Sequence, residues 1–87
     1  MYKIKWEKKA IKEFKTFDKT TQLFIKKWID KNIYNTNAPR RCGNPLKGNL
    51  SEYWRYRIGN YRIICKIEDN ELCILVISIG SRKSIYK

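Results

Sequence analysis

Arg55, Arg57 and Arg62 stand within eight positions of one another in the second half of this 87-residue chain. The planar guanidinium group binds a phosphate through two parallel hydrogen bonds, which the ammonium group of lysine cannot do. All six arginines follow residue 39, whereas the ten basic side chains of the first 37 residues are all lysine. A lysine-rich chain that gathers its arginines in one segment indicates a site for a phosphate group.

The spacing of these arginines predicts that they share one face of a β-hairpin. Arg55 and Arg57 are two residues apart, so their side chains point to the same side of a strand. If the chain turns at residues 59–60, Arg62 on the next strand lies across from the neighbourhood of Arg57. The intervening side chains are expected to belong to the core rather than to stack on bases: Trp54, Tyr56 and Ile58.

No acidic residue accompanies these arginines in the predicted hairpin, since none occurs between Glu52 and Glu68. Like charges that face each other across two strands are destabilising, and acidic side chains usually stand between them. An uncompensated cationic cluster on a rigid sheet suits a multiply charged anion. The alternative is a solvated strand face that is merely basic, and basic character alone does not separate binding from catalysis.

Hydrophobic periodicity predicts the elements that carry this cluster, in the order β-α-α-β-β-β. Apolar and basic side chains alternate over residues 2–6, which is typical of a half-buried strand. One helix is expected over residues 7–16, and a second begins at Asp18 as its N-cap and runs to about residue 34. A loop and three further strands follow, over residues 35–49, 53–58, 61–67 and 72–79.

The predicted fold class is α+β, with a small, mostly antiparallel sheet and a helical hairpin packed on one face. The two helices are joined by a few residues, so they should lie antiparallel. Only they can cover the apolar face of the sheet, and the other face is then open to solvent. The apolar stripe expected on the second helix consists of Phe24, Ile25, Trp28, Ile29 and Ile33, with Leu23 beside it.

Length and charge limit the function classes. Residues 1–87 are expected to form a single domain, near the lower end of what one core supports. The net charge of +12 and the isoelectric point of about 9.9 favour a polyanionic partner and salt-dependent binding. No membrane partner is expected, because the chain has neither a transmembrane run nor one basic amphipathic run. No signal peptide is recognised, and a cytoplasmic location is expected.

Metal chemistry is not expected in this chain. It contains no histidine, and its three cysteines lack the spacing of metal ligands: Cys42, Cys65 and Cys73. Cys65 and Cys73 stand in apolar strand contexts, so they are expected to be small buried hydrophobic residues. We therefore predict neither a metal nor another cofactor.

Three segments and the order of elements together point to a known family. The segments are Pro-Leu-Lys-Gly at residues 45–48, the arginine-rich stretch at residues 54–64, and the ending at residues 77–86. With the order β-α-α-β-β-β they resemble the RelE/ParE toxin superfamily, on the RelE side. The resemblance covers essentially the whole chain, and its second half is the specific part.

The resemblance implies the toxin of a type II toxin–antitoxin system. RelE-type toxins are ribosome-dependent endoribonucleases that cut mRNA in the ribosomal A site, through attack of the 2′-hydroxyl on the phosphate and without a metal. The implied partners are the ribosome, mRNA and an acidic antitoxin, which would join the toxin in a heterotetramer or a larger complex.

The resemblance also implies which residues act on RNA. Four arginines would bind and neutralise the phosphate, and a terminal tyrosine would transfer a proton: Arg55, Arg57, Arg62, Arg82 and Tyr86. Three lysines are expected to contact RNA: Lys47, Lys66 and Lys83. The chain departs from the best-known members by having arginine at both positions of its first C-terminal strand, where lysine is common, and this removes an amine that could exchange a proton.

Two other functions stay open from the sequence. One is a ParE-like toxin that inhibits DNA gyrase by binding, a branch that resembles this one in fold. The other is a module that only binds, either a degenerate toxin or a nucleic-acid-binding antitoxin partner.

Overall fold

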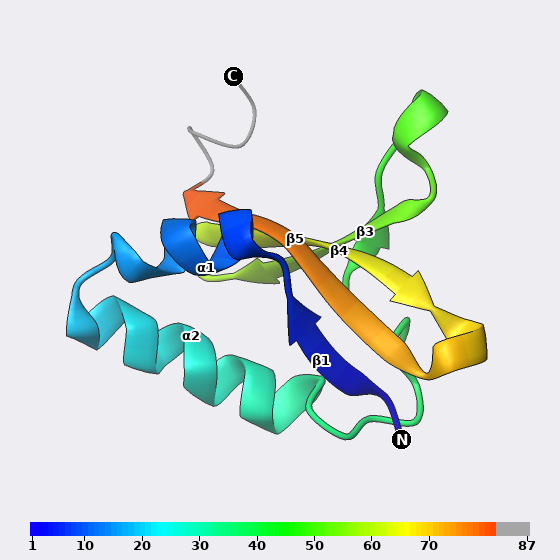
Figure 1. Ribbon diagram of the computed structural model, residues 1–87, viewed down its shortest axis with the longest axis horizontal. Helices are drawn as coiled ribbons and strands as arrows, with labels where there is room; N and C mark the ends of the chain where they lie inside the picture. The colour runs from blue at the N-terminus through cyan, green and yellow to red at the C-terminus, as the bar shows by residue number, and fades with distance from the viewer. Residues whose placement is uncertain (82–87) are drawn as a thin grey trace.

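The computed structural model describes residues 1–81, which form a five-stranded mixed sheet with two helices (Figure 1). The strand order is β1-β5-β4-β3-β2. The first strand is parallel to its neighbour β5, and the remaining neighbours are antiparallel. The elements are β1 (Lys3–Trp6), α1 (Lys8–Lys15), α2 (Lys19–Asn32), β2 (Asn44–Pro45), β3 (Tyr53–Ile58), β4 (Tyr61–Glu68) and β5 (Cys73–Ser81). The predicted α+β class and the order of its main elements are confirmed, while the two-residue strand β2 was not predicted.

Polar side chains determine where helix α2 begins and how it is connected to the end of α1. Asp18 is the N-cap of α2, as predicted, and its carboxylate accepts a hydrogen bond of 2.8 Å from the Thr21 amide, which lowers the pKa of Asp18. The Gln22 side chain donates to the carbonyls of Phe14 and Phe17, at 3.3 and 2.9 Å, and so ties α2 to the end of α1. Within residues 1–81, neither helix is long and apolar enough to cross a membrane.

The core lies between the helices and one face of the sheet. On α2 the side chains of Ile25, Ile29 and Ile33 are buried, as expected for residues four apart on a helix. The expectation that Phe24 belongs to this stripe is wrong, because its side chain is 50% exposed. Consecutive helical residues differ in direction by about 100°, and Phe24 instead covers the turn between β3 and β4, within van der Waals reach of Gly59.

Alternation along the strands separates the core face from the open face. Tyr56 and Ile58 on β3 are fully buried, and Trp54 packs against the core, as predicted. The Tyr56 hydroxyl donates to the Pro39 carbonyl, and burial raises the pKa of this phenol. On the neighbouring strands the same face buries Ile63, Cys65, Ile74 and Val76, while Cys73 is buried on the opposite face, where it pairs with Glu68. The expectation that Cys65 and Cys73 are small buried residues is therefore confirmed.

Helix α1 continues along the edge of the sheet where β1 ends. Strand β1 pairs with β5 as far as Trp6 and Val76. The amide of Glu7 then donates to the Val76 carbonyl at 2.9 Å, and α1 follows beside the second half of β5. A helix side chain can therefore satisfy the backbone of β5 beyond the end of β1.

Candidate functional site

The predicted arginine cluster is formed by the register of the hairpin. The chain turns at Gly59, whose φ is 58°, and Arg57 on β3 pairs directly with Arg62 on β4. Arg55 pairs with Ile64, so all three arginines share the face of the sheet that is opposite the core. The prediction that Arg62 lies across from the Arg57 neighbourhood is confirmed.

The three arginines differ in exposure. Arg57 is exposed and Arg55 is half-buried, whereas Arg62 is only 3% exposed. Across the next pair of strands Arg62 stands opposite Gly80, which has no side chain. Because arginine stays charged in proteins, Arg62 places a fixed positive charge within this part of the sheet.

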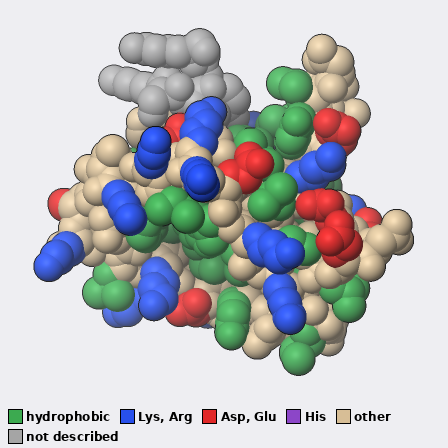
Figure 2. Space-filling model, in the orientation of Figure 1, with side chains coloured by type: hydrophobic (Ala, Val, Ile, Leu, Met, Phe, Trp, Pro, Cys, Tyr) green, Lys and Arg blue, Asp and Glu red, His purple; other side chains and the backbone are tan. Residues whose placement is uncertain are grey.

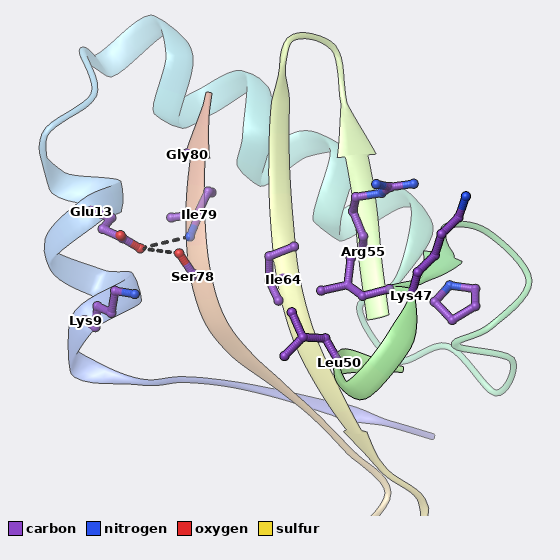
Figure 3. Close-up of a pocket in the computed structure, with 11 residues that line it drawn as sticks. Lys9, Glu13, Lys47, Leu50, Arg55, Ile64, Ser78, Ile79 and Gly80 are labelled. Atoms are coloured by element: carbon purple, nitrogen blue, oxygen red, sulfur yellow. Dashed lines mark hydrogen bonds between the residues drawn. The ribbon is translucent and has the colours of Figure 1, made fainter. Parts of the chain in front are cut away.

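A groove of about 550 Å³ crosses the open face next to Arg55 (Figure 3). Its floor is the sheet, one wall is α1, and the other wall is the segment around β2. It is lined by Lys9, Glu13, Pro45, Leu46, Lys47, Leu50, Arg55, Ile64, Ser78, Ile79 and Gly80. We call this feature the open-face groove. Arg55 and Lys47, two of the predicted site residues, meet in it.

The wall that carries Lys47 is held against β3 by backbone contacts. Pro45 pairs with Trp54, and the Trp54 indole donates to the Cys42 carbonyl at 2.9 Å. Gly43 lies so close to β3 that a Cβ atom there would stand 2.4 Å from the carbonyl oxygen of Arg55. Its φ of 86° also favours glycine. Only glycine therefore lets this wall approach the strand closely enough to close the groove.

Glu13 is a functional candidate that the sequence did not reveal. Its Oε1 atom accepts hydrogen bonds from the Ser78 hydroxyl and the Ile79 amide, both at 3.0 Å. The Ile79 amide lies beyond the last residue of β5 that pairs with β1, so the carboxylate takes the place of a strand carbonyl. The acidic side chain missing from the hairpin thus comes from α1, 65 residues before Ser78.

The charges of the groove are divided between its two walls. Figure 3 shows Glu13 and Lys9 on the side of α1, and Arg55 and Lys47 on the opposite side, with Ile64 between them. Among residues 1–81, three cations and one carboxylate line the groove, so it favours an anion. An apolar floor between cations and a carboxylate can hold a phosphodiester together with the sugar beside it.

Arg57 faces a second, smaller hollow at the outer edge of β3. This hollow has a volume of about 280 Å³ and also includes Arg55. Its other lining residues are Trp28, Cys42, Gly43 and Asn44. Arg55 therefore stands between the two hollows, and Arg57 extends the cationic surface beyond the open-face groove.

One further predicted site residue, Lys66, lies away from this groove. Lys66 is exposed, pairs with Tyr53 and Leu75, and is absent from the groove lining. Three of the predicted residues lie outside the described residues 1–81: Arg82, Lys83 and Tyr86.

Arg40 serves a structural contact away from the groove. Its guanidinium makes two hydrogen bonds to the Asp69 carboxylate, at 3.0 and 2.9 Å, and the Tyr2 hydroxyl donates to the same carboxylate at 2.6 Å. The hydrogen bonds from Arg40 and Tyr2 lower the pKa of Asp69 to about 2, and Asp69 raises the pKa of Tyr2. This triad links the N-terminus to the loop before β2 and to the turn before β5.

The sequence matches one protein family over nearly its whole length. The model for the ParE toxin of the type II toxin–antitoxin system parDE matches residues 4–86. Toxin RelG of Mycobacterium tuberculosis is 29% identical over 52 residues, which make up 60% of this chain and 60% of that protein. Toxin RelE of the same organism is 33% identical over 51 residues, or 59% of this chain and 53% of that protein. The match thus spans between about half and three fifths of the length of these curated relatives.

Solved structures share the fold over almost the full chain. The toxin–antitoxin complex RelBE2 from Mycobacterium tuberculosis contains a chain that matches with a TM-score of 0.83 and 18% identity, covering 93% of this chain and 91% of that one. The isolated E. coli RelE toxin matches with a TM-score of 0.69 and 22% identity, and the match covers 99% of this chain and 92% of that one. At these identities the likeness concerns the fold, and it agrees with the predicted α+β architecture.

Proposed function

From the premise that the chain belongs to the RelE/ParE superfamily of type II toxin–antitoxin toxins, we propose that it is a ribosome-dependent endoribonuclease. The proposed reaction is cleavage of mRNA in the ribosomal A site, where the 2′-hydroxyl attacks the adjacent phosphate without a metal ion. The observation that supports it best is the open-face groove, in which Arg55 and Lys47 face the Glu13 carboxylate. The site of action would be the cytoplasm, where the ribosomes are.

Arg55 is the residue that we assign to the scissile phosphate. It lines both the open-face groove and the smaller hollow at the edge of β3, so it can meet an RNA strand that crosses β3. Negative charge grows on the phosphate oxygens in the transition state, and a preorganised donor that meets this charge contributes about 3 kcal/mol. Lys47 would add a second cation, and Arg57 would hold the neighbouring phosphate.

The buried Arg62 would act on the phosphate through its charge. A charge at low exposure is screened less by water than one on the surface, so it adds to the positive potential of the open face. The family resemblance assigns Arg82 to the phosphate and Tyr86 to proton transfer. Lys66 and Lys83 would contact the RNA further from the scissile bond.

The dependence on the ribosome follows from the small number of groups that can transfer protons. The chain has no histidine, so an RNA in free solution would be cut slowly. A ribosome can present the message in a fixed orientation, which a domain of this size cannot impose alone. Figure 2 shows lysine and arginine side chains spread over the visible face, and these would contact ribosomal RNA phosphates without reading sequence.

Expression in a bacterial host tests the proposed function. Wild-type protein should stop growth and translation, and mapping of mRNA ends should reveal cuts within codons. The Arg55→Ala protein, present at the same level and folded, should let growth continue. Growth arrest with intact mRNA would reject the proposal.

Inhibition of DNA gyrase is the second candidate, and the description of the matching family model as a ParE toxin favours it. A gyrase inhibitor would act by binding and would not need the Glu13 carboxylate or the arginine cluster as a reaction centre. Expression should then induce the DNA damage response, and purified protein should inhibit supercoiling by gyrase. Intact supercoiling activity together with cut mRNA would exclude this candidate.

An acidic antitoxin is the partner that we propose for the chain, in a heterotetramer or a larger complex. The solved structures of similar fold include toxin–antitoxin complexes. A mostly apolar hollow of about 540 Å³ lies where α1, α2 and β1 meet, and Figure 2 shows apolar side chains gathered there among lysines. It is lined by Ile4, Trp6, Ile11, Phe14, Lys15, Gln22, Lys26, Ile29, Asp30 and Tyr34. Apolar contacts flanked by Lys15 and Lys26 suit an amphipathic segment with acidic residues.

A further inference from the structure

We propose that Glu13 is the general base of the cleavage reaction and takes the proton from the attacking 2′-hydroxyl. This inference rests on the proposed endoribonuclease function and names a residue for one of its steps. A general base needs a free lone pair, a fixed position next to the phosphate site, and a route for its proton. Each of these follows from the surroundings of Glu13.

The first requirement, a free lone pair, is met because the hydrogen bonds from β5 use one oxygen of the Glu13 carboxylate. Both hydrogen bonds, from the Ser78 hydroxyl and the Ile79 amide, go to Oε1. Within residues 1–81, Oε2 has no hydrogen-bond partner. The strand therefore fixes the carboxylate through one oxygen and leaves the other available to a ligand.

The second requirement concerns distance from the phosphate site. Glu13 lies beside the outer edge of β5 and Arg55 extends from β3, with Ile64 of β4 between them (Figure 3). Neighbouring strands are about 4.8 Å apart, so β3 and β5 are about 10 Å apart, and the carboxylate lies beyond β5 by up to one more strand spacing. A nucleotide that lies over Ile64, with its phosphate held by Arg55 and Lys47, directs its sugar towards Glu13.

If Glu13 had a purely structural role, this would explain its contact with β5. It would not explain why the residue is a glutamate rather than a glutamine. Beyond the end of β1, the Ile79 amide needs an acceptor, and the amide oxygen of glutamine would serve equally well. Among residues 1–81, Glu13 is the one carboxylate that lines the open-face groove. A carboxylate repels a phosphate. Its presence in a site for an anion therefore indicates that it accepts a proton during the reaction.

The proposed step conserves atoms and charge. The 2′-hydroxyl gives its proton to Oε2 of Glu13, and the 2′-oxygen forms a bond to phosphorus. The bond between phosphorus and the 5′-oxygen breaks, and the 5′-oxygen takes a proton from water, directly or through Tyr86, to which the resemblance assigns proton transfer. The products are a 2′,3′-cyclic phosphate and a 5′-hydroxyl, and Glu13 returns its proton to the solvent.

Replacement of Glu13 by glutamine tests the assignment, because the amide oxygen keeps the acceptor for Ser78 and Ile79. Single-turnover cleavage of a defined mRNA on ribosomes should slow by at least a hundredfold, which is the lower end of what a general base contributes. Ribosome binding and the thermal midpoint should stay unchanged. The matched control is Glu7→Gln, which removes the same charge from an exposed position outside the groove and should cleave at the wild-type rate.

The pH profile separates a base from a structural anchor. Wild-type cleavage should depend on pH in a way that the Glu13→Gln protein lacks. A Glu13→Gln protein that cleaves within threefold of the wild-type rate would overturn the assignment. If that variant unfolds, the wild-type profile decides, because a rate that does not change with pH would also overturn it.

Failure of this inference can be told apart from failure of the proposed function. An active wild type with an equally active Glu13→Gln variant rejects Glu13 alone. A wild type that leaves ribosome-bound mRNA intact rejects the endoribonuclease proposal, and the assignment of Glu13 with it.

Discussion

Arg57 lies directly opposite Arg62 across β3 and β4, yet Arg57 is exposed while Arg62 is buried. Two like charges in this position destabilise a sheet unless they are separated or compensated. Here Arg62 is buried opposite Gly80, whereas the Arg57 side chain is exposed to solvent. The two arginines should therefore respond differently to substitution.

Replacement of Arg57 by alanine should weaken RNA binding and leave stability unchanged. Its side chain is exposed, so few packing contacts are lost. The affinity for single-stranded RNA should fall less steeply with salt concentration than that of the wild type, because one phosphate contact is missing. Filter binding at several salt concentrations measures this slope, and an unchanged slope would argue against a phosphate contact.

Replacement of Arg62 by alanine should instead cost stability, on the order of 2 kcal/mol, because it empties a buried site. Urea denaturation of the Arg57→Ala and Arg62→Ala proteins provides the comparison. Equal loss of stability in both would contradict the difference in burial.

Gly43 should be far less tolerant of alanine than Gly48. Both have positive φ, 86° and 67°, so both substitutions strain the backbone by about 1 kcal/mol. At Gly43 the new Cβ would also collide with the Arg55 carbonyl and the Trp54 indole, whereas at Gly48 it meets nothing within 4 Å. We expect Gly43→Ala to lose more than about 2 kcal/mol and cleavage activity, and Gly48→Ala to keep its activity. Similar stabilities of the two variants would contradict the close approach at Gly43.

The triad of Asp69, Arg40 and Tyr2 should make a contribution to the free energy of unfolding that depends on pH. The pKa of Asp69 is lowered to about 2 in the folded protein, and an unfolded aspartate has a pKa of about 3.9. A lowered pKa means that the contribution is complete above the unfolded value and is lost as the pH falls through the folded value. The denaturation midpoints of wild type and Asp69→Asn should therefore differ at pH 7 and converge between about pH 4 and pH 2. A difference that stays constant over this range would contradict the prediction.

Antitoxin binding and RNA cleavage should be separable by substitution. Ile11 lines the apolar hollow between α1, α2 and β1 and is 37% exposed, so Ile11→Glu should fold. It should release the cognate antitoxin and still cut mRNA. Lys47→Ala should do the reverse, because Lys47 lies in the open-face groove. Co-purification and cleavage assays on both proteins check this, and joint loss of both activities in either folded variant would contradict the separation.

The sequence predicted those features of the site that depend on local pattern. Strand parity placed Arg55 and Arg57 on one face, and the turn at Gly59 brought Arg62 opposite Arg57. Asp18 was recognisable as an N-cap, because its partner is only three residues away.

The features that the sequence did not predict depend on residues far apart in the chain. Arg62 pairs with Gly80 on β5, and an irregularity between Ile64 and Cys65 shifts the register further along the two strands. Glu13 stands four residues after Lys9 on a helix, a spacing that resembles an ordinary surface ion pair. Its hydrogen bond to Ser78 appears only in the folded chain.

The central claim is that the open-face groove cuts mRNA on the ribosome, with Arg55 at the phosphate. The most direct measurement is single-turnover cleavage of a defined mRNA on ribosomes with a vacant A site, mapped by primer extension for wild type and Arg55→Ala. We expect a single cut in the A-site codon by the wild type and a rate at least a hundredfold lower for the folded Arg55→Ala protein. Intact mRNA with the wild type, or equal rates for the two proteins, would contradict it.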